Sequence, residues 1–326
     1  MFKDKKILFL SVRFHNYEVE ILKKLQSLGA EVDFFDSRPS NSFISKVLIR
    51  INNSLVSRRI NKYYDQVFAS IAEKTYDYVF VIKAESVTSD IILRFKKAQP
   101  NAKFILYLYD SIRNNRQVKG LIPFFDKVLT FDKEDADLID IAIFRPLFFL
   151  DDYCQEIKPV NTYDACFIGT VHSDRYMILR KIERQLKGRY KLFFYFYLPS
   201  KFYYYAKVFT DSSFRNTRAD DFKYKSLPHT EVANIVLASK VVVDIQHPKQ
   251  SGLTMRTFEV LAAKRKLITT NKSIKDYDLY NDLNVCVVDR KNPLIDERFL
   301  NSTFDEISPD ILNRYSLHSF LIDVFS

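Results

Sequence analysis

Apolar runs alternate with helical patterns along the first half of the chain. Between the first two runs, Ile21, Leu22, Leu25 and Leu28 fall on one helical face, and Gly29 is suited to end that helix. Strands are predicted for the runs KKILFLSV, AEVDFFDS, YDYVFVIKA, KFILYLYDS and KVLTFDK. A long helical pattern also covers residues 43–72. Strands that alternate with helices are typical of a parallel sheet with crossover helices, so the pattern predicts an α/β fold.

The second half restarts the same alternation after a linker over 150–162. Strands are predicted at 163–170, 190–199, 240–247, 266–271 and 284–289, with helices at 173–186, at 231–238 and from near 251. A length of 326 residues exceeds the size of most single cores. We therefore expect two α/β domains, 1–150 and 151–326, with the C-terminal helical stretch packed back on one of them.

Composition indicates a globular cytoplasmic protein. Hydrophobic residues make up 47% of the chain and charged residues 28%. Cys154, Cys166 and Cys286 are far apart, which favours reduced thiols over a disulfide framework. The N-terminal apolar run is short and lacks a small-residue cleavage site, so we interpret it as the first strand. The sequence has no run of 18 apolar residues and predicts no membrane-spanning helix.

One of only five glycines stands in the stretch HPKQSGLTMRTFEVLAAKRKLITTN, residues 247–271. A helix that starts near Ser251 offers unpaired amides and a positive dipole end to an anion, and Gly252 lets a phosphate approach the backbone. Arg256 and Glu259 are one turn apart, and an Arg suits phosphate oxygens while a Glu suits ribose hydroxyls. The alternative is an exposed helix pair of little consequence.

The segment SGLTMRTFEVLAAKRKLITTN resembles the C-terminal-domain signature of GT-B glycosyltransferases, particularly the group related to CgeB proteins and to bacterial surface-polysaccharide synthesis. The resemblance implies two Rossmann-like domains that face each other across a cleft, with a nucleotide-sugar donor held mainly by the second and the acceptor held by the first. It places Gly252 and Thr254 at the donor diphosphate, Arg256 as its counter-charge and Glu259 on the ribose. This chain has AAKRK where the family usually has Gly after the helix.

A second candidate phosphate loop is FIGTVHSDR, where a strand ends before a helix. Ser173 and Asp174 signal the helix start. The loop resembles the first loop of the donor domain in the same enzymes, although an ordinary strand-to-helix turn is an alternative. Gly169 stands at the turn, and Thr170, His172 and Arg175 are each candidates to reach a phosphate or the sugar.

An inverting glycosyl transfer needs a general base to take the acceptor proton. The candidates are His15, after the first strand, and Asp110, at the end of the strand ILYLYDS. Both have structural alternatives as capping or surface residues. Glu85, with Lys83 nearby, is a third candidate, and a retaining enzyme needs no dedicated base. GT-B enzymes stabilise the leaving diphosphate with helix dipoles and basic side chains, so neither a metal nor a cofactor is expected.

A net charge of +10 raises nucleic acid or an anionic membrane as partners. Nucleic-acid signatures are missing from the sequence. Residues 38–63 hold six basic residues and no acidic one among apolar positions, which suits a helix on anionic headgroups, with a solvated basic helix as the alternative. For FYYYAKVF, residues 202–209, we expect a core helix, with an acceptor wall or an interfacial anchor as alternatives.

The sequence thus predicts a metal-independent glycosyltransferase that moves a sugar from a nucleotide-sugar donor to a cell-surface polysaccharide or lipopolysaccharide acceptor. The acceptor is expected to be lipid-linked, with the enzyme cytoplasmic and peripheral on the inner face of the membrane. Two other classes fit the same residues: a GT-B-fold sugar-nucleotide epimerase, and a catalytically silent binding or scaffold protein of polysaccharide assembly.

Overall fold

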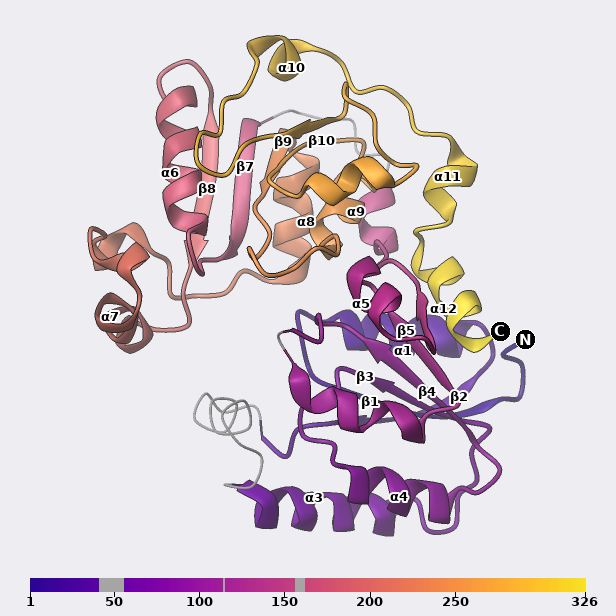
Figure 1. The fold of residues 1–326 in the computed structure, drawn as a ribbon. Coiled ribbons are helices and arrows are strands. Elements are labelled where there is room, and N and C mark those ends of the chain that lie inside the picture. Colours follow the sequence, from indigo (N-terminus) through magenta and orange to yellow (C-terminus); the bar gives the residue numbers. More distant parts are fainter. Residues whose placement is uncertain (41–55, 114, 156–161) are drawn as a thin grey trace. The chain divides into compact units, whose positions relative to one another are not determined.

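The computed structural model describes residues 1–40, 56–113, 115–155 and 162–326. The chain divides into two compact units. Unit 1 comprises Met1–Pro146 and Leu317–Ser326, and unit 2 comprises Leu147–Ser316. Each unit is a parallel β-sheet with helices, as the alternating pattern predicts (Figure 1).

Unit 1 is built on six parallel strands in the order β2-β1-β3-β4-β5-β6. The strands are β1 (Lys6–Ser11), β2 (Glu31–Asp36), β3 (Tyr78–Ile82), β4 (Lys103–Leu108), β5 (Lys127–Thr130) and β6 (Ala142–Phe144). The helices are α1 (Tyr17–Ser27), α3 (Ser57–Ser70), α4 (Ser89–Ala98) and α5 (Lys133–Leu138), with short 3₁₀ turns at Arg116–Gly120 and Ile122–Phe124. Only the 57–70 part of the helix predicted over 43–72 is seen, because 41–55 lie outside the described residues.

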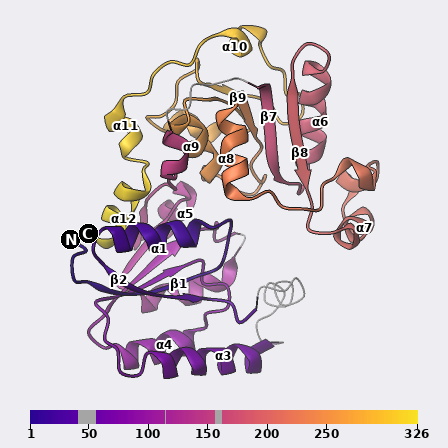
Figure 2. The same cartoon turned by 180° about the vertical axis from the view of Figure 1, so that it is seen from behind.

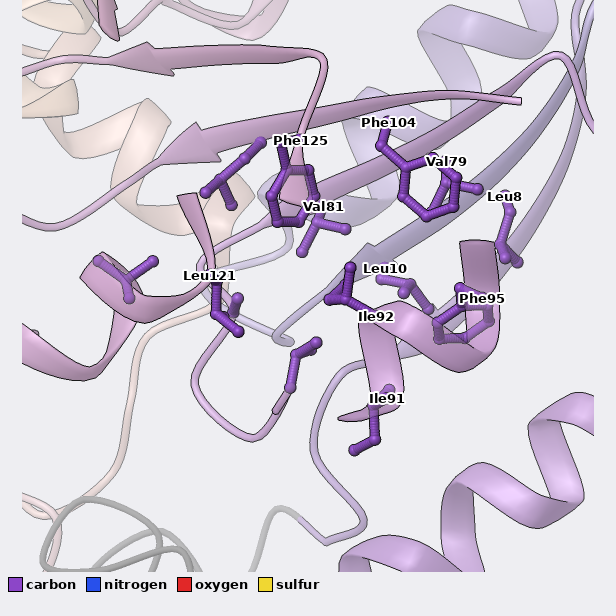
Figure 3. Packing of buried hydrophobic residues seen from close by; sticks show 14 of the residues in the cluster. Leu8, Leu10, Val79, Val81, Ile91, Ile92, Phe95, Phe104, Leu121 and Phe125 are labelled. Carbon is purple, nitrogen blue, oxygen red and sulfur yellow. The ribbon is translucent and has the colours of Figure 1, made fainter. Parts of the chain in front are cut away.

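Both faces of the central strands β1, β3 and β4 are buried, which explains why these strands are apolar at nearly every position. On one face, side chains of α4 meet Leu8, Leu10, Val79 and Val81 (Figure 3). On the other face, Phe9 stacks on Phe80 with ring centroids 5.3 Å apart. Gly29 follows α1 with φ of +95°, the left-handed conformation that was expected of it at the helix end.

The last helix, α12 (Leu317–Phe325), belongs to unit 1 although the chain reaches it from unit 2. Its terminal Phe325 makes edge contacts with the rings of Tyr78 and Phe80, and Phe320 contacts Tyr107. The expected packing of the C-terminal stretch on one half is therefore seen for α12. The second unit begins at Leu147 and ends at Ser316, instead of covering 151–326, because this apolar helix completes the other core.

Unit 2 holds five parallel strands in the order β11-β10-β9-β7-β8. They are β7 (Tyr163–Thr170), β8 (Leu192–Tyr197), β9 (Ser239–Asp244), β10 (Lys266–Thr269) and β11 (Val285–Val287). Figure 2 labels β7, β8 and β9 of this sheet. The helices are α6 (Arg175–Leu186), α7 (Lys201–Thr210), α8 (His229–Leu237), α9 (Met255–Ala262), α10 (Glu297–Asn301) and α11 (Pro309–Asn313). Short 3₁₀ turns lie at Asp151–Cys154, Ser212–Phe214, Ala219–Asp221 and Lys272–Asp276.

The turn after α9 has a lysine at the position where glycine was expected from the resemblance described above. Lys264 adopts φ of +54°, the Lys264 amide donates to the Leu261 carbonyl, and the Arg265 amide donates to the Val260 carbonyl. These two bonds form a Schellman motif, which normally places glycine at the left-handed position. Lysine therefore holds the expected turn at the cost of a left-handed backbone.

Candidate functional site

The strand order of unit 2 fixes where a ligand is expected to bind. From β7 the chain adds β8 on one side of the sheet and then crosses to add β9 on the other side. Ligands of open parallel sheets bind outside the carboxyl ends of the strands at such a switch point. The loops that follow β7 and β9 therefore carry the first candidate residues.

The loop after β7 is tied to the end of β9 by Arg175, the first residue of α6. Its Nε donates to the Ile245 carbonyl at 2.6 Å and its Nη1 donates to the Thr170 carbonyl at 2.8 Å. A Cβ on Gly169 would lie 3.6 Å from the same Nη1 and 3.1 Å from the Phe167 ring. Glycine at position 169 thus leaves room for the Arg175 guanidinium. Arg175 holds the two loops together through two of its hydrogen-bond donors.

Burial lowers the pKa of Arg175 to about 10, with nearby Arg290 and Arg256 acting in the same direction and Asp244 opposing them. The guanidinium stays charged at neutral pH. A charge held in low-dielectric surroundings interacts more strongly with an anion than one in water. The site therefore offers a fixed positive charge close to the switch point.

His172 is a neutral residue of this loop. Burial lowers its pKa to about 3, helped by the charges of Arg175 and Arg290 and by His247. The rings of His172 and His247 lie 5.2 Å apart, and His172 Nδ1 is 3.0 Å from the Ser173 hydroxyl. His172 can therefore form a hydrogen bond with a ligand, but it does not add a positive charge near pH 7.

Arg290 was missed by the sequence reasoning. It follows β11 and forms a two-pronged ion pair with Asp174, with Nε to Oδ2 at 2.8 Å and Nη2 to Oδ1 at 2.9 Å. It also donates to the Gln246 carbonyl and the Thr270 hydroxyl. Asp174 is the residue before α6, as the capping signal predicted. Its carboxylate makes no hydrogen bond to the helix amides and pairs with Arg290. The sequence signal that could have indicated Arg290 is its position as a basic residue just after the last predicted strand of the sheet.

The helix α9 begins at Met255, four residues later than expected. Its N-cap, Thr254, is extended, and the Thr254 hydroxyl is directed to the Asp244 carboxylate at the end of β9. The preceding loop is held by Asn271, whose Nδ2 donates to the Ser251 carbonyl at 3.0 Å and to the Gly252 carbonyl at 3.3 Å. Asn271 thereby pins the buried Gly252 loop in front of the helix N-terminus.

Arg256 and Glu259 come together as the spacing predicts, with Nη1 3.1 Å from Oε2. The Glu259 side chain is 0% exposed and that of Arg256 is 20% exposed, so the pair is not the surface pair considered as an alternative. Arg256 Nη1 also donates to the Tyr153 hydroxyl at 3.3 Å. Burial raises the pKa of Tyr153, and the negative charge of Glu259 adds to that effect.

This burial revises the role expected for Glu259. A carboxylate without exposed surface presents no oxygen to a ribose in this conformation, whereas it is well placed to fix the Arg256 guanidinium. Phe258 and Leu261, on the other side of α9, are each 1% exposed, as expected for its core face. Arg256 is therefore the member of the pair that retains some access to solvent.

In unit 1 the corresponding edge carries a network of charges. Lys83 follows β3 with φ of +53° and lies 2.8 Å from Asp110 Oδ2 and 3.3 Å from Glu85 Oε1. Arg38 grips Glu85 through Nη2 at 2.6 Å and Nε at 2.8 Å. Glu85 is thus nearly buried between two cations and is a poor candidate base. Asp110 keeps 36% of its side chain exposed.

His15, the other candidate base, is exposed and has φ of +51° after β1. Its ring lies 4.3 Å from that of Phe14, and Phe14 in turn lies beneath the Lys83 amine at 5.0 Å. The structure therefore brings both candidate bases to the carboxyl edge of the unit 1 sheet, near its own switch point between β1 and β3.

The basic segment 38–63 is only partly described, since 41–55 lie outside the described residues. Arg38 is buried against Glu85, so it is not a headgroup contact as that segment suggested. Within the described ranges no helix is both long and apolar enough to cross a membrane. The same residues contain no group of three or more His, Cys, Asp or Glu side chains arranged to hold a metal.

Comparison with known proteins supports the fold. The chain matches no protein-family profile and no curated protein sequence. Among solved structures it is similar to HepE of Anabaena in complex with UDP-glucose, with a TM-score of 0.63 and 9% identity over 98% of each chain. It is also similar to a glycosyltransferase from Rickettsia africae, with a TM-score of 0.53 and 14% identity over 100% of this chain and 95% of that one.

A UDP-N-acetylglucosamine 2-epimerase matches as well, with a TM-score of 0.51 and 9% identity over 100% of this chain and 95% of that one. These likenesses span almost the whole chain. Together with the two parallel α/β units, they confirm the predicted GT-B fold.

Proposed function

We propose that the protein is a glycosyltransferase that moves a sugar from a nucleotide-sugar donor to a cell-surface glycan acceptor. The observation that carries the proposal is the gathering of Arg175, Arg256 and Arg290 at the carboxyl edge of the unit 2 sheet, beside the start of α9. Each guanidinium is held in place, Arg256 by Glu259, Arg290 by Asp174 and Arg175 by two backbone carbonyls. Such preorganised guanidinium donors suit a diphosphate leaving group. The similarity to HepE, whose structures contain UDP-glucose or UDP, supports the same type of donor here.

In this proposal the donor diphosphate binds at Gly252, Thr254 and the first amides of α9, with Arg256 as its counter-charge. Glu259 and Tyr153 hold the Arg256 guanidinium in place. Gly169, Thr170 and neutral His172 contact the sugar or phosphate from the other loop, and Arg175 and Arg290 supply charge behind them. As the sugar leaves, negative charge grows on the diphosphate, and these groups stabilise it without a metal.

On the acceptor side we propose Asp110 as the general base, with His15 as the second candidate. Lys83 orients the Asp110 carboxylate through an ion pair of 2.8 Å while more than a third of the Asp110 side chain stays exposed. The finer proposals are an acceptor that is lipid-linked polysaccharide or lipopolysaccharide, a location on the cytoplasmic face of the membrane, and kinship with the CgeB-like group.

The test is product analysis with a panel of UDP, GDP, dTDP and CMP sugars, with and without membrane glycolipid extract. A glycosyltransferase should release nucleotide and glycosylate the extract. Conversion of the donor sugar without any acceptor would favour the epimerase, which the similarity to the 2-epimerase keeps as the second candidate. Nucleotide binding with neither reaction would favour a catalytically silent binding protein.

A further inference from the structure

The helix α7 carries its large aromatic side chains on the outside. Phe202, Tyr205 and Phe209 are 76%, 54% and 82% exposed. Their spacing of three and four residues puts them on one face of a ten-residue helix. The core helix expected for 202–209 is therefore wrong for this face. An apolar helix face in water is costly unless something covers it.

The inner face of α7 is firmly attached, which makes the outer face a stable surface. Tyr204 is 5% exposed, its ring packs on Phe222 at 5.4 Å, and its hydroxyl donates to the Thr217 carbonyl at 2.7 Å. Ser200 caps the helix by accepting from the Tyr203 amide at 3.1 Å. Within unit 2, α7 lies at the margin beyond the end of β8 in both views (Figures 1 and 2).

The surrounding segment is basic. Between 200 and 225 the chain has six basic and three acidic residues. Five of the basic side chains are exposed, namely Lys201, Arg215, Arg218, Lys223 and Lys225. Aromatic residues beside lysine and arginine are the combination that binds the interface of an anionic bilayer, where rings enter the headgroup region and cations meet lipid phosphates.

We propose that the outer face of α7 docks on a membrane surface that contains anionic phospholipid. The occupant is a bilayer instead of a second copy of this chain, because a symmetric dimer through this face would bring two basic segments together. The proposal is independent of glycosyl transfer, since none of these residues belongs to the proposed donor or acceptor sites.

Because the chain contains no tryptophan, a single one can report on this face. In the full-length protein, Phe209→Trp is compared with Leu294→Trp, a control at a residue of unit 2 that is 67% exposed. On vesicles of phosphatidylcholine with phosphatidylglycerol, we expect a blue shift and quenching by brominated lipid for Phe209→Trp alone. Pure phosphatidylcholine vesicles should give neither effect.

The second arm measures vesicle cosedimentation. Phe202→Ser combined with Phe209→Ser should weaken binding on the order of tenfold or more, whereas Leu294→Ser should bind like the parent. Since both phenylalanines are exposed, the double variant should keep the parent's thermal unfolding. Equal binding by the double variant would overturn the proposal, as would loss of binding only when Arg58, Arg59 and Lys62 of α3 are neutralised. The proposal would also be overturned if the parent protein does not bind anionic vesicles but forms dimers that the double substitution weakens.

Discussion

The buried pair of Arg256 and Glu259 gives the most quantitative prediction. Arg256→Met removes the guanidinium that lies 3.1 Å from the Glu259 carboxylate, a group that is 0% exposed in the parent. Removing one partner of a buried ion pair costs about 3–5 kcal/mol. We expect the lower end, about 3 kcal/mol, because Arg256 is itself 20% exposed and water can approach the remaining carboxylate.

The assay is hydrogen exchange of the α9 amides, because a chain of two units can unfold in more than one step and exchange reports the opening of this helix itself. A loss of about 3 kcal/mol speeds exchange by about two orders of magnitude. The control is the exposed pair of Arg189 and Glu297, where Arg189→Met should cost about 0–1 kcal/mol.

The double variant Arg256→Met with Glu259→Leu completes the test. If the two charges stabilise each other, its cost should fall below the sum of the single costs by about 0.5–3 kcal/mol. Strict additivity, or a cost of Arg256→Met no larger than that of Arg189→Met, would refute the interpretation of a buried and coupled pair.

Three further predictions follow from single residues. The pKa of His172 is about 3 in the folded protein and near 6.5 when unfolded, so the neutral side chain stabilises the fold above pH 6.5 and that stability is lost as pH falls toward 3. Between pH 7 and 5, the free energy of unfolding measured with urea should therefore fall by up to about 2 kcal/mol less in His172→Asn than in the parent. Equal pH dependence of the two proteins would contradict this. Asp110→Asn should lower kcat about a hundredfold or more with nucleotide affinity unchanged, measured by transfer kinetics and titration; an unaltered kcat rejects Asp110 as the base. Lys264→Gly should stabilise the protein by about 1 kcal/mol by relieving its left-handed φ of +54°, and a melting temperature that does not rise would contradict it.

The positions of the candidate residues could largely be predicted, because parallel strands place their following loops at one edge of a sheet. Thr170 at the end of β7, His172 two residues later, and Asp110 after β4 lie at such edges for that reason. Helical period was equally informative in α9, where Phe258 and Leu261 enter the core and Arg256 meets Glu259. These features depend on local sequence alone.

Other features depend on contacts that a local pattern does not contain. The start of α9 is set by the Thr254 contact with Asp244, ten residues earlier, and the role of Arg290 is set by Asp174 from another strand's loop. The aromatic period of α7 is the same whether its face is buried or exposed, so burial had to come from the structure. The sequence alone suggests that Arg38 is a surface cation, whereas the structure shows it paired with Glu85.

Nucleotide binding tests the central claim most directly. Thermal unfolding with UDP, GDP, dTDP or CMP is compared for the parent, for Arg256→Gln with Glu259→Gln, and for the exposed control Arg189→Gln with Glu297→Gln. The paired glutamines remove charge without leaving an ion alone in the interior. At a hundredfold excess over its dissociation constant, a nucleoside diphosphate should stabilise the parent and the control by about 2.7 kcal/mol and the Arg256 double variant far less. An equal response in all three proteins would contradict a diphosphate site at the start of α9.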